Sequence, residues 1–246
     1  MRFLAAILGG LCFLVLAFPQ PGNAIPIVGD GPLGDFEAEL TYEASSATEA
    51  TLTITITNTS PVDNGGYLTA FVFNNPGDKI TGITLSATDS DFHLLTAEAD
   101  DDDDDKGGKG GKGGKGDKEG KGHKEDDDDE GINAEPFGLF DFGVSTGDSF
   151  QGGGNPALGI GVGVTETFTF TLSGTGLDTL DAMSFVYALS TGKGGKCCAF
   201  FVARFRGFND GGSNKTNGVL APEPGTLLLL GSGLAGLGLW RRKKRG

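Results

Sequence analysis

The most regular pattern in this chain is Thr51-Leu52-Thr53-Ile54-Thr55-Ile56-Thr57, and it indicates the fold class. Apolar and hydroxyl side chains alternate along it without a break. Because successive side chains of a β-strand point to opposite faces of the sheet, Leu52, Ile54 and Ile56 share one face and the threonines share the other. The pattern therefore predicts a strand with one buried side and one solvent-facing side.

Similar but less regular runs occur elsewhere, and turn-forming residues separate them. We expect strands at 36–42, 51–57, 67–73, 80–87, 137–142, 166–172, 185–189 and 198–208. An alternative for 177–189 is a short helix. Many short strands without a long amphipathic helix predict an all-β fold, an antiparallel β-sandwich of the immunoglobulin-like or jelly-roll-like kind.

Phenylalanine supplies much of the expected core, with 18 such residues in the chain. Two runs concentrate it: Phe168-Thr169-Phe170, and Phe200-Phe201 followed closely by Phe205. We interpret both runs as core and cross-strand packing rather than as a platform on which sugar rings stack.

Residues 100–130 interrupt the strand pattern. They hold 14 acidic residues, 7 lysines and 9 glycines, and no aliphatic or aromatic side chain. Such a segment cannot bury enough apolar surface to offset the entropy of ordering, so we predict a disordered charged insertion in a surface loop. The sandwich would then consist of 25–99 and 131–221. One interpretation is that the insertion merely stays solvated; the other is that its acidic blocks collect Ca²⁺ while its lysines contact an anionic polysaccharide.

The charge of the chain is unevenly distributed. The 246 residues carry a formal net charge of −14, but 6 of the 19 basic residues and only 1 of the 33 acidic residues lie in the two ends, 1–24 and 222–246. The segment 25–221 therefore carries −19. Such a body repels phosphate backbones, so we expect no nucleic-acid partner.

The first 24 residues have the pattern of a secretory signal peptide. Arg2 precedes an apolar run from Phe3 to Phe18, and Pro19 ends this run. Small residues then occupy the −3 and −1 positions of a cleavage site after Ala24. The run is shorter than the roughly 20 apolar residues of a spanning helix. We predict export through the Sec machinery with cleavage after Ala24.

The other end has three parts in a fixed order. Pro222-Glu223-Pro224 precedes an apolar stretch at 226–240, and a basic cluster follows, made up of Arg241, Arg242, Lys243, Lys244 and Arg245. The stretch predicts a short transmembrane segment, and the positive-inside bias keeps the basic cluster in the cytoplasm.

These three parts, preceded by a signal peptide, resemble the PEP-CTERM sorting signal of Gram-negative envelope proteins. The resemblance covers the last 25 residues. It implies that a membrane-embedded exosortase recognises Pro222, Glu223 and Pro224 while 226–240 stays transiently in the inner membrane and 241–245 acts as the cytoplasmic stop. It also implies cleavage near this motif and transfer of the body to the cell surface or to exopolysaccharide.

Other candidate sites are sparse. Asp89 and Asp91 lie near a strand end and could bind Ca²⁺ weakly, although a solvated turn is the simpler interpretation. Cys197 and Cys198 form a possible redox pair. Because consecutive Cα atoms are about 3.8 Å apart and strand side chains alternate, we expect no bond between them. Two alternatives remain, an intermolecular crosslink or, as we favour, one buried and one reactive thiol.

No nucleophile elbow, zinc-ligand spacing or phosphate-binding loop occurs in the sequence. We therefore expect a non-catalytic protein of the cell surface or extracellular matrix, sorted by an exosortase and associated with exopolysaccharide or biofilm. The alternatives are a carbohydrate-binding β-sandwich module and a plain membrane-anchored surface protein. A secreted hydrolase that uses paired carboxylates is the least favoured reading.

Overall fold

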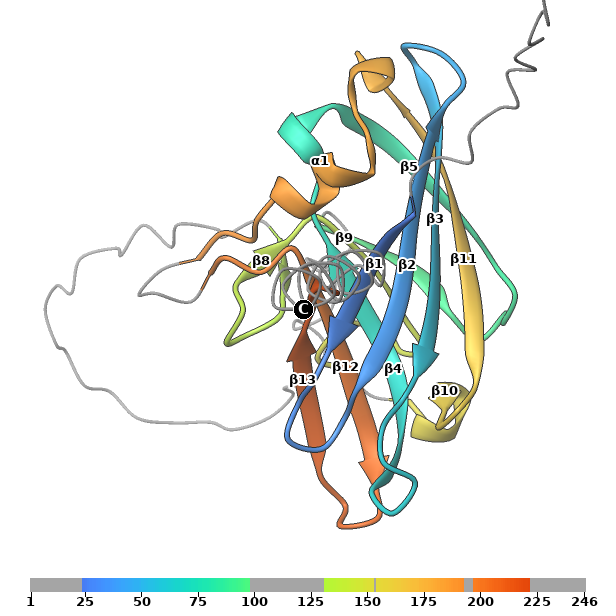
Figure 1. Cartoon of the computed structure of the whole chain (residues 1–246), viewed down its shortest axis with the longest axis vertical. Coiled ribbons are helices and arrows are strands. Elements are labelled where there is room, and N and C mark those ends of the chain that lie inside the picture. The colour runs from blue at the N-terminus through green and yellow to red at the C-terminus, as the bar shows by residue number, and fades with distance from the viewer. Residues whose placement is uncertain (1–23, 98–130, 153, 193–196, 222–246) are drawn as a thin grey trace, which may run out of the picture.

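The computed structural model describes residues 24–97, 131–152, 154–192 and 197–221. These residues form an all-β fold of two large antiparallel sheets with one short α-helix (Figure 1). The predicted insertion 100–130 and the predicted segments before 24 and after 221 lie outside the described residues.

The first sheet has six strands in the order β14-β1-β2-β3-β11-β5. Their bounds are β1 Ile25–Gly29, β2 Phe36–Ala44, β3 Glu49–Asn58, β5 Ile80–Ala87, β11 Thr165–Gly174 and β14 Val219–Leu220.

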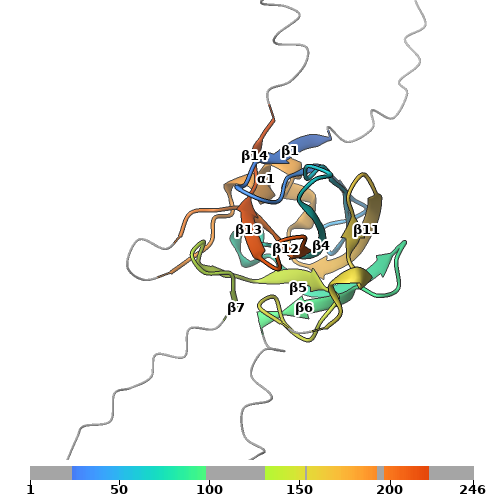
Figure 2. The same cartoon turned by 90° about the horizontal axis from the view of Figure 1, so that it is seen from below.

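The second sheet has the order β13-β12-β4-β9-β6, with β10 paired to β4 beside this path. Their bounds are β4 Gly65–Phe73, β6 His93–Thr96, β9 Phe142–Ser145, β10 Ile160–Gly161, β12 Phe201–Phe208 and β13 Ser213–Asn217. The remaining elements are the small pair β7 Ile132–Asn133 and β8 Leu139–Phe140, the helix α1 Ala182–Tyr187, and the 3-10 turns Pro76–Asp78, Pro156–Leu158 and Leu177–Thr179. Seen from below, the strands are arranged around a common interior (Figure 2).

The alternating stretch that opened the sequence lies at the centre of the first sheet. β3 pairs with β2 on one side and with β11 on the other, and Ile54 lies opposite both Leu40 and Phe168. Leu52, Ile54 and Ile56 are fully buried, as the alternation predicts. On the outer face, threonine hydroxyls pair across the strands, including Thr55 with Thr167 and Thr57 with Thr165.

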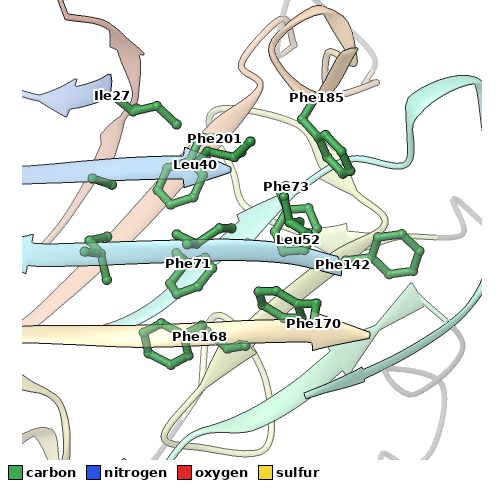
Figure 3. Packing of buried hydrophobic residues seen from close by; sticks show 14 of the residues in the cluster. Ile27, Leu40, Leu52, Phe71, Phe73, Phe142, Phe168, Phe170, Phe185 and Phe201 are labelled. Carbon is green, nitrogen blue, oxygen red and sulfur yellow. The ribbon is translucent and has the colours of Figure 1, made fainter. Parts of the chain in front are cut away.

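The core between the sheets is built largely from phenylalanine rings (Figure 3). Phe71 of β4 contacts Phe168 of β11 edge-on, with ring centroids 4.9 Å apart, and it stacks on Phe201 of β12 at 5.3 Å. Phe73 and Phe170 meet across the sheets at 5.2 Å. Each ring is at most 1% exposed, which confirms that these phenylalanines form core rather than a sugar platform.

A second, smaller core lies on the other side of the second sheet. Ala70, Val72 and Val202 alternate with the residues of the main core and therefore point away from it. Side chains of the segment 131–152 cover them, among them Phe140 and Phe150. Both β4 and β12 are consequently buried on two faces.

The predicted strands agree with the structure in part. The ranges 36–42, 51–57, 67–73, 80–87 and 166–172 lie within β2, β3, β4, β5 and β11. The range 137–142 divides between β8 and β9, and the last predicted strand begins at Phe201 rather than at 198.

The strand predicted at 185–189 is wrong, because α1 occupies this region and the alternative of a short helix holds. The Asp181 carboxylate accepts the Ser184 N–H at 2.8 Å, and the Ser184 hydroxyl accepts the Asp181 N–H at 3.1 Å. This reciprocal capping box starts the helix. The sequence did not predict the short strands β1, β6, β10, β13 and β14, because they have no strong alternation of apolar and polar residues.

Candidate functional site

The last described residues run along the edge of the first sheet. The two residues of β14, Val219 and Leu220, pair with β1, and their side chains are 51% and 44% exposed. One residue further, the Ala221 N–H donates to the carbonyl oxygen of Pro26 at 2.9 Å. The chain therefore passes from an edge strand directly to the predicted sorting signal.

The predicted sorting residues Pro222, Glu223 and Pro224 lie outside the described residues, as do the membrane segment at 226–240 and the basic cluster at 241–245. Within the described ranges, no helix is both long and apolar enough to cross a membrane. The assignments of these residues remain predictions from the sequence.

The predicted signal-cleavage residue lies at the same edge of the sheet. Ala24 is exposed and directly precedes β1, whose first residue is Ile25. β1 pairs with β14, so the described strands that adjoin the two predicted processing points are neighbours in the sheet, and Figure 2 shows β1 and β14 side by side. The sequence alone gave no sign of this proximity, since nearly 200 residues separate the two strands.

An open groove of about 390 Å³ lies beside these strands, on the outer face of the first sheet. Two glutamates, two threonines and the residue before the sorting signal contribute to its walls. The lining residues are Pro26, Ile27, Val28, Glu37, Ala38, Glu39, Thr55, Thr57 and Ala221.

A cationic cluster on the second sheet was also missed by sequence reasoning. Arg204 of β12 lies directly opposite Lys215 of β13, and Arg206 follows two residues along on the same face. Only one other Lys or Arg, Lys79, occurs in the described ranges. The Arg-x-Arg spacing within an apolar strand is the signal that identifies this face.

Burial changes the proton affinity of this cluster. It lowers the pKa of Lys215 to about 8, helped by the charge of Arg204 and opposed by that of Glu135. Burial also lowers the pKa of Arg204, with a further contribution from Arg206. The cost of removing the cations from water exceeds the attraction of the nearby carboxylate.

The contacts of the cluster give it a structural role. The Arg204 guanidinium donates to the carbonyl oxygen of Phe150 at 2.6 Å, and the Lys215 ammonium donates to the carbonyl oxygen of Glu135. That ammonium also lies 5.7 Å from the centroid of the Phe150 ring, a cation–π distance. These contacts tie the segment 131–152 to the second sheet.

Asp141, between β8 and β9, was not singled out from the sequence. Its carboxylate accepts the Asn75 N–H at 2.8 Å. Burial raises the pKa of Asp141, the hydrogen bond from Asn75 opposes this, and the charge of Asp78 adds to the rise. The residue links two loops at one end of the sandwich.

Asp89 and Asp91 lie in the turn between β5 and β6. The Asp89 carboxylate accepts the backbone N–H of Asp91 at 2.9 Å, a local turn contact that uses one of its oxygens. Among the described residues, no group of three or more His, Cys, Asp or Glu side chains could hold a metal ion. The weak Ca²⁺ assignment therefore gains no support from the arrangement of neighbouring residues.

Cys197 and Cys198 are joined by a disulfide, which corrects the prediction of two separate thiols. The prediction assumed strand geometry, in which neighbouring side chains point to opposite faces. Cys198 instead has a φ of 78°, and β12 begins only at Phe201, so that argument does not apply.

The comparisons with known proteins match one part of the chain. The family described as PEP-CTERM protein-sorting motif matches residues 220–243. No curated protein and no solved structure matches the chain. The match begins at Leu220, the second residue of β14, and it includes Pro222, Glu223 and Pro224. The chain therefore carries a PEP-CTERM protein-sorting motif, which indicates an exosortase-targeted surface protein.

Proposed function

We propose that the protein is a non-catalytic component of the cell surface or extracellular matrix that an exosortase recognises and cuts near Pro222-Glu223-Pro224. The match of residues 220–243 to the sorting motif carries this proposal. The route begins with Sec export and cleavage after Ala24. The C-terminal segment then holds the body at the inner membrane until the exosortase acts.

Association with exopolysaccharide is the second part of the proposal. The segment 25–221 carries −19, and its insertion combines blocks of aspartate with regularly spaced lysines. Carboxylates in such blocks attract Ca²⁺, which also binds the carboxylates of acidic polysaccharides. The lysines would contact the same polymer directly. Both contacts are electrostatic, so they weaken as the salt concentration rises.

The groove beside β1 supports a second candidate, a carbohydrate-binding module. Glu37 and Glu39 offer acceptors for sugar hydroxyls, and Thr55 and Thr57 offer both donors and acceptors. Sugar sites usually add an exposed aromatic face. Tyr187 is the one strongly exposed aromatic side chain in the described ranges, and it lies on α1 rather than in the groove lining. We therefore rank this candidate second.

The test of sorting compares cells with and without an exosortase. The mature body is isolated from each, and its intact mass is measured. We expect loss of the residues that follow the sorting motif only where the enzyme is present, and we expect Glu223→Ala to reduce that loss. An intact C-terminus in both cells contradicts the proposal and favours a plain membrane anchor.

A second experiment separates the candidate roles of the body. The purified body is incubated with neutral and acidic polysaccharides, with and without Ca²⁺, and binding and product formation are measured. Calcium-dependent retention on the acidic polymer supports matrix association. Salt-resistant binding of a neutral glycan that Glu39→Gln abolishes favours the carbohydrate-binding module, and turnover of any glycan contradicts the non-catalytic assignment.

A further inference from the structure

Packing against the core changes at Gly218: the backbone there is buried, whereas the two residues that follow are about half exposed. The Gly218 N–H donates to the carbonyl oxygen of Phe201 at 2.8 Å. A β-carbon at Gly218 would lie 2.7 Å from the Ile27 side chain and 3.2 Å from the Phe201 side chain, so the backbone there is packed against the core. The two residues that follow form β14 and leave about half of each side chain in solvent.

β14 contributes little to the stability of the body. It is a strand of two residues, and among the described strands β1 is its one neighbour in the sheet. Releasing β14 would expose edge backbone of β1. It would add little newly exposed apolar surface on β14 itself, because Val219 and Leu220 are already about half exposed. Such short edge strands can exchange one pairing partner for another.

The space between the folded body and the membrane is short. Four residues, 222–225, separate the last ladder bond at Ala221 from the predicted membrane segment at 226. Fully extended, they reach at most about 14 Å. Extended peptides are commonly bound by strand pairing, in which main-chain hydrogen bonds hold several consecutive residues. If the enzyme holds the chain around Pro222-Glu223-Pro224 in this way, its cleft also takes up Val219 to Ala221.

We propose that β14 leaves β1 when the exosortase binds, and that Val219 and Leu220 are recognition residues of the sorting signal. This inference rests on the proposed function. The backbone groups of β14 exchange their partners on β1 for partners in the cleft of the enzyme, and the two exposed apolar side chains enter its subsites. Gly218 stays fixed and limits the release to the residues after it. The start of the family match at Leu220 fits this extent of the signal.

A crosslink between the two strands tests the release. Val28 and Val219 lie directly opposite each other, so the double variant V28C/V219C can form a disulfide that holds β14 on β1. In cells that contain the exosortase, we expect the crosslinked body to keep its C-terminus. The single variant V28C should be processed like the wild type. V219C measures the effect of the substitution alone, and the crosslinked double variant should be cut less than V219C. Intact mass identifies the crosslink and the processing state, and thermal unfolding confirms that the body is folded.

Processing of the crosslinked variant at the level of V219C overturns the release of β14. That result leaves the proposed function standing, because the wild type is still cut. Failure to cut the wild type defeats the proposed function instead, so the two failures are distinguishable.

A second pair of variants tests recognition. V219D and L220D place charges on side chains that are exposed in the body, so both variants should fold. If these side chains enter apolar subsites, processing slows by about tenfold or more. The matched control V62D alters an even more exposed valine in the loop between β3 and β4, and it should be processed normally. Wild-type processing of both test variants overturns the recognition role.

Discussion

Lys215 and Arg204 place like charges on directly opposite positions of two neighbouring strands. Such a pairing normally destabilises a sheet. Here both cations donate to backbone carbonyl groups of the segment 131–152, so the repulsion is offset by contacts that hold this segment in place. The residual cost is visible in the lowered pKa of Lys215.

The stability of the body should therefore depend on the protonation of Lys215. Its pKa falls from 10.5 to about 8 on folding, so its contribution to stability is present above pH 10.5 and is lost as the pH falls through 8. Because the side chain is partly exposed, solvent screening reduces the effect to about 1 kcal/mol. Urea unfolding measures the free energy of unfolding of the wild type and of Lys215→Met. The wild type should become less stable relative to the variant as the pH falls from 10.5 to 8. A difference that is constant with pH contradicts the assignment.

The bond between Cys197 and Cys198 leaves neither thiol free for a second chain. We expect the oxidised secreted body to migrate as a monomer on a non-reducing gel and to show no reaction with a thiol reagent before reduction. After reduction, two thiols should react. Dimers that disappear with reductant would instead support the intermolecular crosslink.

At the level of elements, α1 shows how a local cap overrides an apolar pattern. The range 185–189 contains enough apolar residues to suggest a strand, but the capping box of Asp181 and Ser184 fixes the first turn of a helix. The helix then packs Phe185 against Tyr42, with ring centroids 5.5 Å apart. α1 thus closes one end of the core.

Removing the cap should weaken this closure. Asp181→Ala leaves the Ser184 N–H without its acceptor, and we expect a loss of about 1 kcal/mol in the free energy of unfolding. Chemical denaturation of the body measures the change. Asp148→Ala removes an exposed carboxylate that lies outside the helix and should cause little loss. Equal losses in the two variants would show that the cap does not stabilise the body.

In the whole molecule, the described residues on the two sides of the predicted insertion lie at neighbouring positions. The Ala97 N–H donates to the carbonyl oxygen of Asp141 at 3.2 Å, and Ile132 pairs with Phe140, the residue before Asp141. The two flanks are thus anchored side by side. An insertion between two such neighbouring positions does not have to cross the core.

Shortening the predicted insertion should leave the body folded. Replacing 98–130 by about eight glycine and serine residues reduces the entropy cost of closing the loop by about 1 kcal/mol. We expect the free energy of unfolding to stay the same or to rise by this amount. Thermal and urea unfolding of the shortened body measure it. A clear loss of stability would show that the insertion makes contacts that the body needs.

Local patterns in the sequence were enough to predict the fold class and the sorting signal. Long alternating runs such as 51–57 report burial directly, because a strand with one buried face needs an apolar side chain at every second position. The sorting signal is likewise a linear pattern, in which a Pro-Glu-Pro motif, an apolar stretch and a basic cluster follow one another in a fixed order. Neither inference requires knowledge of which distant residues meet.

Which segments meet became known from the three-dimensional structure. It placed β14 against β1, it covered the second sheet with the segment 131–152, and it joined Cys197 to Cys198. Two-residue strands carry almost no periodicity, and the pairing of residues nearly 200 positions apart depends on how the whole core packs. The pairing of the two strands that adjoin the predicted processing points is therefore a property of the folded chain, not of either end alone.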